Sequence, residues 1–135
     1  MVMTLEADYA VRIVEMLAVS RSRKDARSIS DEAQVPLRFA LKILRKLVAG
    51  GLVVSYKGAR GGYMLAREPG KITLRQVIES VEGPYMISRC QQEEYDCTKT
   101  SCRFHHIYDE ISAVVREKLD SYTFEVLNAE LPKKS

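Results

Sequence analysis

Cysteine and histidine are nearly absent from this sequence of 135 residues, and the few that occur are confined to one segment. All 3 cysteines and both histidines lie within residues 90–106, CQQEEYDCTKTSCRFHH. The N-terminus lacks the basic leader, apolar core and cleavage site of a secretory signal, so we expect a cytoplasmic protein. In that compartment a disulfide framework is not expected, and three thiols cannot all pair within one chain.

Long hydrophobic runs, internal repeats and low-complexity tracts are missing as well. No apolar run approaches the roughly 18 to 20 residues that a membrane span needs, so we expect no membrane partner. The chain is 46% hydrophobic and 29% charged, which is ordinary for a globular protein. Its length fits one domain with a modest core and a small appendage.

Positive charge is concentrated in the middle of the chain. Residues 21–75 hold 13 Lys/Arg and 4 Asp/Glu, a local charge of +9, whereas residues 76–135 hold 7 basic and 11 acidic residues, a local charge of −4. An ordinary solvated surface would not predict this asymmetry, and a basic patch of this kind neutralises phosphates. We therefore expect a nucleic acid as the partner of residues 21–75.

Apolar periodicity and turn residues predict a mainly α-helical protein with one small β-hairpin. Thr4, Ser28 and Thr73 are placed to start three of the helices, and Gly50 to end another. Two helices joined by a tight turn and followed by a hairpin is the order of a winged helix-turn-helix. The expected elements are helices over 5–19, 28–34, 36–49, 73–82 and 105–122, and strands over 52–56 and 63–66.

In a winged helix-turn-helix the second helix of the pair enters the major groove of DNA, and the hairpin meets the backbone or the minor groove. That helix is here 36–49, and we expect Leu37, Ala40, Leu44 and Leu47 to face the core. Basic residues outside this apolar stripe and at the hairpin tip are the candidate DNA contacts. They are Arg38, Lys42, Arg45, Lys46, Lys57 and Arg60.

The last expected helix, 105–122, is long and has a narrow apolar stripe. A helix of this length at the end of a small domain is not expected to cover only its own core. Pairing with a second copy of the chain is therefore favoured over an ordinary capping helix. The stripe consists of Ile107, Ile111, Val114, Val115, Leu119 and Tyr122.

The segment 90–106 has the donor set of a soft-metal site. Six residues separate Cys90 from Cys97, four separate Cys97 from Cys102, and His105 follows one helical turn later. Three thiolates and an imidazole can bind zinc, but the wide cysteine gaps suit an iron–sulfur cluster better than a zinc knuckle. Two other interpretations are incidental cysteines and a catalytic Cys–His pair. The second lacks an oriented third group and a substrate pocket, so we expect no enzyme activity and no small-molecule substrate.

Several stretches of the sequence resemble the Rrf2 family of winged-helix transcription regulators. They are the opening LEADYAVRIVEML, then LRKLVAGGLVVSYKGARGGYMLA, then ITLRQVIESVEGP, and the three cysteines. The resemblance is to the iron–sulfur cluster-binding branch, with its IscR-like and NsrR-like members. It implies a homodimer that binds a double-stranded DNA operator, and Cys90, Cys97 and Cys102 match the cysteines that hold the family's cluster.

The resemblance also implies a fourth ligand and a set of base contacts. His105 occupies the place of a histidine that completes a 2Fe–2S site in IscR-like members, and Asp8 that of a partner-subunit aspartate in NsrR-like members. The fourth ligand stays open between them; 2Fe–2S is favoured over 4Fe–4S, and zinc is the alternative metal. Arg38, Phe39 and Leu41 sit where recognition helices of the family reach base edges. Core packing is the alternative role for Phe39.

The sequence thus predicts a homodimeric repressor or activator that senses redox state, nitric oxide or iron–sulfur status. Residues 1–83 would form the DNA-binding domain, with its first helix packing on the dimer helix. Residues 84–104 would form the cluster-binding loop, and residues 105–135 the dimerisation helix and C-terminal tail. The alternative is a cluster-free regulator of the same fold that acts through thiols, zinc or protein–protein contact.

Overall fold

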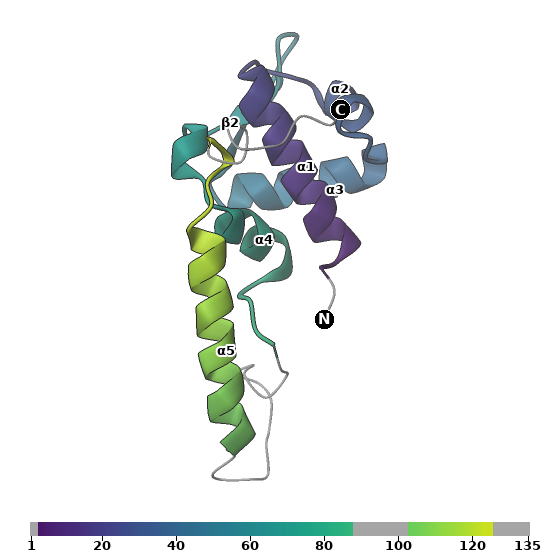
Figure 1. The fold of residues 1–135 in the computed structure, drawn as a ribbon. Coiled ribbons are helices and arrows are strands. Elements are labelled where there is room, and N and C mark those ends of the chain that lie inside the picture. The colour runs from purple at the N-terminus through teal and green to yellow at the C-terminus, as the bar shows by residue number, and fades with distance from the viewer. Residues whose placement is uncertain (1–2, 88–102, 126–135) are drawn as a thin grey trace, which may run out of the picture.

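The fold is mainly helical with one two-stranded antiparallel sheet, as predicted (Figure 1). A computed structural model describes residues 3–87 and 103–125. No helix within these ranges is long and apolar enough to cross a membrane. In chain order the elements are α1 Leu5–Ser20, α2 Ala26–Ala33, α3 Leu37–Ala49, β1 Val53–Tyr56, β2 Gly62–Leu65, the 3-10 turn η1 Pro69–Lys71, α4 Leu74–Glu82 and α5 Arg103–Asp120.

Side-chain caps set the starts of the helices before α3 and after the sheet. Thr4 caps α1, and Thr73 caps α4 in a full capping box, both as predicted. The prediction for α2 was wrong: the cap is Asp25, whose carboxylate accepts a hydrogen bond from the Ser28 N–H at 2.8 Å, so the helix begins at Ala26. That hydrogen bond to its charged form holds the pKa of Asp25 below its usual value.

A short turn joins α2 to α3 and fixes the helix-turn-helix. Gln34 ends α2 in the left-handed conformation (φ 56°), and Val35 is buried behind it. We had expected α3 to begin at Pro36, but Pro36 is its N-cap. The chain is therefore extended at Pro36 and becomes helical one residue later, at Leu37.

The wing is the β1–β2 hairpin with a turn over residues 57–61. Tyr56 lies opposite Gly62 in the register. The chain before α2 adds an isolated bridge to the second strand: the Lys24 N–H donates to the Tyr63 carbonyl at 3.0 Å, and the Tyr63 N–H donates to the Lys24 carbonyl at 2.7 Å. A Cβ on Gly62 would lie 2.7 Å from the Lys24 carbonyl oxygen, so this close approach requires glycine.

The hydrophobic core lies where α1 packs against α4, α3 and α2. Ala40, Leu44 and Leu47 of α3 are fully buried, as predicted, whereas Leu37 is only half-buried. Ile43, which we did not assign to the core, is fully buried as well. The buried stripe of α3 is thus wider than predicted, and its opposite face is left to charged residues.

Helix α5 projects away from this body and is attached to it by its C-terminal end (Figure 1). The Arg75 guanidinium of α4 lies 2.8 Å from Asp120, and this contact raises the pKa of Arg75. The predicted end of the helix at Tyr122 is wrong, because the chain leaves the helix after Asp120. The Leu74 N–H donates to the Tyr122 carbonyl at 2.9 Å, and Phe124 is fully buried.

The expected division of the chain is only partly visible in the described residues. Helix α5 already contains Arg103 and Phe104, two residues before the expected start of the dimer helix. Within one chain α1 packs mainly on α4, α3 and α2, and α5 packs on α4, so packing of the first helix on the dimer helix stays a prediction for the assembled dimer. Most of the expected cluster loop, and residues 126–135 of the expected tail, lie outside the described residues.

Candidate nucleic-acid interface and metal-binding segment

The outward face of α3 carries cations around one exposed aliphatic side chain. Arg38, Leu41 and Arg45 are spaced by three and four residues, so they share one face of the helix, and all three are exposed. Leu41 is 41% exposed, whereas the apolar residues on the opposite side of α3 are buried. Lys42 lies beside them, with its side chain 59% exposed and its Nζ 3.9 Å from the Glu6 carboxylate. This face can offer both charge and an apolar contact to a partner.

Two other expected DNA contacts of α3 are turned toward the protein. The Phe39 ring packs against the core and meets the Tyr9 ring edge-on, with the centroids 5.7 Å apart. The Lys46 Nζ lies 2.9 Å from the Glu6 carboxylate and 3.3 Å from the Val81 carbonyl oxygen. Lys46 therefore ties α3 to α1 and to the end of α4, a role that the sequence did not reveal. Phe39 takes the alternative role considered for it, packing on the core.

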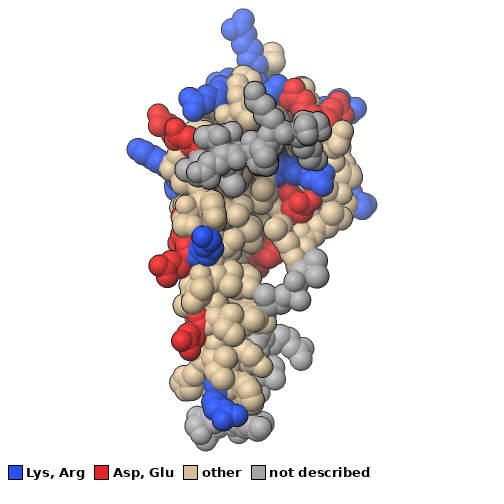
Figure 2. Space-filling model, in the orientation of Figure 1, with Lys and Arg blue, Asp and Glu red and all other residues tan. Residues whose placement is uncertain are grey.

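The wing tip is narrow and exposed. Lys57 and Arg60 are exposed in the turn, and the wing end of the molecule carries Lys and Arg side chains that project beyond the rest of the surface (Figure 2). Gly58 adopts a φ of 97° and its carbonyl accepts a hydrogen bond from the Gly61 N–H at 2.9 Å. A Cβ on Gly61 would lie 2.6 Å from the Tyr56 carbonyl oxygen. Glycine thus allows a tight turn that presents two cations.

Arg23, in the loop between α1 and α2, contacts the wing, and the sequence did not identify it. Its guanidinium carbon lies 3.6 Å from the centroid of the Tyr56 ring, and its Nη1 donates a hydrogen bond to the Arg60 carbonyl at 3.0 Å. In the sequence Arg23 belongs to a polar stretch, RSRKDAR, whose composition indicates a loop and nothing more. Its partners lie more than thirty residues away, so no local pattern could have revealed the pairing.

Two groups of cations differ in their carboxylate partners. Arg12, Lys24, Lys46 and Arg75 each have a carboxylate oxygen within 3.1 Å and join elements or helical turns of the body. The second group has no carboxylate of the described residues within 4.0 Å, and its members lie in the α1–α2 loop, α2, α3, the wing and the segment after it. These are Arg21, Arg23, Arg27, Arg38, Arg45, Lys57, Arg60 and Arg67. Cations left without internal partners are available to phosphates.

Of the expected metal ligands, Cys90, Cys97 and Cys102 lie outside the described residues. His105 lies in the first turns of α5, with its Nε2 3.3 Å from the Asp109 carboxylate. A metal-binding histidine usually donates its second ring N–H to a carboxylate or carbonyl, so this arrangement would leave Nδ1 to face a metal.

Asp8, the other candidate for the fourth ligand, lies on α1. Its carboxylate is 3.1 Å from the Arg12 guanidinium, and both side chains are about half exposed. Within one chain the first turns of α1 and of α5 lie well apart in space (Figure 1), so the fold does not bring Asp8 and His105 together. Across residues 3–87 and 103–125, no three potential metal-binding side chains form a group.

Hydrogen bonds to Ser112 and Arg116 fasten the chain that leads into the cysteine segment onto α5. The Ile87 N–H donates to the Ser112 hydroxyl at 3.0 Å, and the Arg116 Nε donates to the Tyr85 carbonyl at 2.8 Å. Ser112 is fully buried, although it is polar. As the chain advances from Tyr85 to Ile87, its partners on α5 step back from Arg116 to Ser112, so the two segments run antiparallel.

The expected dimer stripe divides into two faces of α5. One face is exposed and apolar and also includes Phe104; the spacing of its members is three, four and three residues. Its residues and their exposed fractions are Phe104 51%, Ile107 39%, Ile111 41% and Val114 62%. Val115 and Leu119 are half-buried, Leu119 packs against the core, and Tyr122 lies beyond the helix.

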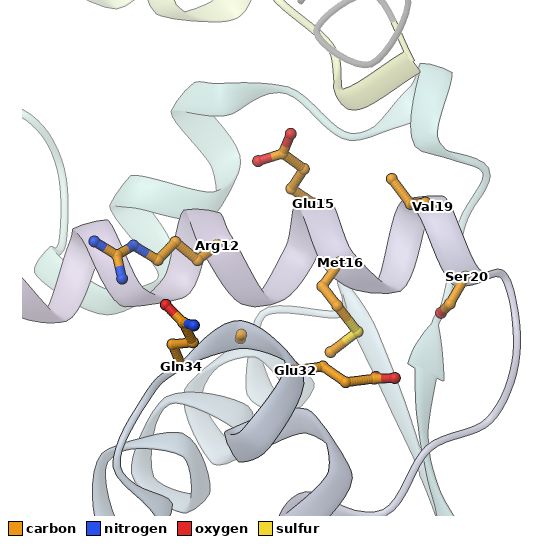
Figure 3. A pocket seen from close by; sticks show the side chains of 8 residues that line it. Arg12, Glu15, Met16, Val19, Ser20, Glu32 and Gln34 are labelled. Carbon is orange, nitrogen blue, oxygen red and sulfur yellow. The ribbon is translucent and has the colours of Figure 1, made fainter. Parts of the chain in front are cut away.

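A hollow of about 740 Å³ lies between α1 and α2 (Figure 3). Met16 points into it from α1 toward Glu32 of α2, while Glu15 points away from α2. Its remaining lining comes from Arg12, Val19, Ser20, Ala33 and Gln34. Because two carboxylates accompany one arginine, this hollow is not a phosphate-binding site.

Comparison with known proteins agrees with these features. The Rrf2 family model, described as an iron-dependent transcriptional regulator, matches residues 3–130. An HTH-type transcriptional regulator of Aquifex aeolicus is 31% identical over 113 residues, which cover 81% of this chain and 78% of that protein. The regulator NsrR of Shouchella clausii is 27% identical over 127 residues, covering 91% and 85%. The structure of CymR, the global cysteine regulator of B. subtilis, matches with a TM-score of 0.78 at 25% identity, covering 98% of this chain and 99% of that one.

Proposed function

This chain belongs to the Rrf2 family of transcriptional regulators, and on that premise we propose that it is a homodimer whose affinity for an operator is set by an iron–sulfur cluster. The family is one of DNA-binding regulators and not of enzymes. The observation that carries the proposal is the set of cations on α3, the wing and the neighbouring loop that lack carboxylate partners among the described residues.

In the proposed complex α3 enters the major groove and the wing meets the adjacent backbone or minor groove. Arg38 can donate two hydrogen bonds to a guanine edge, and Leu41 can contact a thymine methyl group. Lys42 and Arg45 are exposed beside them and suit phosphates. Lys46, held by Glu6, would instead fix the angle at which α3 leaves the body.

The exposed face of α5 is the proposed dimer interface. Phe104, Ile107, Ile111 and Val114 follow the spacing of a coiled-coil seam, and their exposure in one chain supports burial against a second copy. Two half-sites are then read by two α3 helices whose separation depends on how the α5 helices pack.

The fastening of the chain onto α5 supports cluster binding near the start of that helix. Cys90 follows Ile87 by three residues, so it can lie at most about 10 Å further along. His105 precedes Ser112 by seven residues, which is also about 10 Å along a helix axis. Because residues 85–87 run antiparallel to α5, these two lengths would allow Cys90 and His105 to share one site.

Three thiolates with an imidazole or a carboxylate are a donor set that fits an iron–sulfur cluster. Cys90, Cys97 and Cys102 would hold it, with His105 of the same chain or Asp8 of a second copy as the fourth ligand. When bound, the cluster supplies a centre that reacts with oxidants or nitric oxide. The chain's own part is to anchor the ends of the cysteine segment to α5 through Tyr85, Ile87 and the start of the helix.

Anaerobic purification tests the cluster. We expect visible absorption together with iron and sulfide in the purified protein, and a preparation without colour, iron and zinc would overturn the proposal. His105→Ala and Asp8→Ala should then be compared with His106→Ala, which changes the adjacent exposed histidine. The fourth ligand is the residue whose loss alters the absorption spectrum, and His106→Ala should leave the spectrum unchanged.

The likeness to CymR favours a second candidate, a cluster-free regulator that works through its thiols, zinc or a protein partner. The same purification separates the two candidates. Protein that lacks iron but binds a selected operator with an affinity that depends on thiol oxidation, zinc or an added protein would favour the second.

A further inference from the structure

The turn end of the wing is held by an arginine from outside the hairpin. The Arg23 guanidinium stacks on the Tyr56 ring at 3.6 Å and donates to the Arg60 carbonyl at 3.0 Å. The stack sets the plane of the guanidinium, and the hydrogen bond sets its rotation within that plane. Because Tyr56 ends β1 and Arg60 lies in the turn, one side chain joins the strand to the tip.

The backbone next to Arg23 is held to the other strand of the wing. Lys24 and Tyr63 exchange two backbone hydrogen bonds, and Gly62 lets the chains come close enough for both. The loop before α2 therefore reaches both strands, β2 through its backbone and β1 through the Arg23 side chain. Without the side chain, the glycine-containing turn 57–61 would keep only the contacts of its own hairpin.

We propose that Arg23 is a positioning residue of the wing, which fixes the turn so that Lys57 and Arg60 reach the groove flanking the site read by α3. This inference rests on the proposed operator binding. The geometry favours positioning over a direct phosphate contact, because the ring of Tyr56 covers one face of the guanidinium and the Arg60 carbonyl takes one of its N–H groups.

The role can be tested on full-length protein with a duplex selected from random-sequence DNA by the wild type. Arg23→Ala should weaken binding about tenfold, a change of 1.4 kcal/mol. Arg23→Lys should weaken it by a similar factor, because an ammonium keeps the charge but cannot stack and bond as the planar fork does. Tyr56→Leu, which removes the ring and no charge, should do the same. Lys71→Ala is the control: it removes one exposed cation that is not among the expected DNA contacts, and it should cost much less.

A double-mutant cycle with the wing tip distinguishes the two roles of Arg23. In a Lys57→Ala/Arg60→Ala background, Arg23→Ala should add less than a twofold loss, because the groups that it positions are gone. Wild-type affinity in Arg23→Lys, or the full tenfold loss in that background, would mean a direct phosphate contact and overturn the proposal. Wild-type affinity in every Arg23 variant would overturn this inference alone. A wild type that binds and selects no DNA would overturn operator binding together with it.

Discussion

Lys42 and Lys46 lie one turn apart on α3, and we expect replacement of each by alanine to affect different properties. Both are basic, both approach Glu6, and the sequence predicts both as DNA contacts. Lys46 is 2.9 Å from the Glu6 carboxylate and 36% exposed, whereas Lys42 is 3.9 Å from it and 59% exposed. The first is committed to the protein, and the second is available to DNA.

The expected loss of stability follows from the contacts of Lys46. A hydrogen bond that involves a charged group contributes about 1.5–3 kcal/mol when well shielded from water. The Glu6 side chain is 23% exposed and the Lys46 side chain 36%, so solvent screening lowers the expected loss for Lys46→Ala to about 1 kcal/mol. For a chain of this length that is a fall of roughly 3 to 5 °C in melting temperature. Lys42→Ala should leave the melting temperature nearly unchanged.

The effect on DNA binding should be the reverse. Loss of one phosphate contact lowers the slope of log K against log salt by about 0.9, and a dimer with two copies of Lys42→Ala should lose about twice that. Lys46→Ala should keep the wild-type slope. The measurements are urea unfolding at fixed protein concentration, since a dimer's stability depends on it, and titration of the selected operator at several salt concentrations. Unchanged stability and a reduced slope in Lys46→Ala would refute the assignment.

Two further predictions concern the dimer and the cap of α2. Ile111→Glu places a charge in the exposed apolar face of α5 and should yield monomers in analytical ultracentrifugation. The same change at the exposed Ala113, on the far side of the helix, should leave the dimer intact. If both variants remained dimers, the exposed face of α5 would not be the interface. Because the folded-state pKa of Asp25 is lowered from 3.8, its charge stabilises the fold above about pH 4, and that contribution is lost as pH falls through the lowered pKa. The melting temperatures of wild type and Asp25→Asn should therefore differ at pH 7, and the difference should shrink as pH falls below about 4. A difference that stays constant with pH would contradict this.

Features encoded by neighbouring residues could be predicted from the sequence. Thr73 starts α4 as expected, because a helix start is a local property, and it forms a capping box with Gln76. The wing followed from two short apolar runs around a glycine-rich turn. Asp25 was missed as a cap because Ser28, three residues later, is an equally good cap on composition alone. The choice between them depends on where α2 packs.

Features that depend on tertiary contacts could not be predicted in this way. A lysine on the polar side of α3 is expected to be solvent-exposed. Lys46 has partners only because α1 and α4 pack beside it. The Arg23–Tyr56 contact joins a polar loop to the end of β1, more than thirty residues away, so no local pattern indicates it. The stripe on α5 was found, but periodicity could not separate Leu119, which serves the chain's own core, from Ile111, which is left exposed.

A regulator of this kind needs a physical route from the cysteine segment to α3, and α4 is the element that could provide it. At one end α4 holds α5 through Arg75 and Asp120. At the other end its Val81 carbonyl accepts from Lys46, and Lys46 also binds Glu6 of α1. A change in how α5 packs on α4 would therefore reach α3 through hydrogen-bonded contacts. Ligand state can alter operator affinity only if these contacts differ between the two states, so α4 is where that difference should be sought.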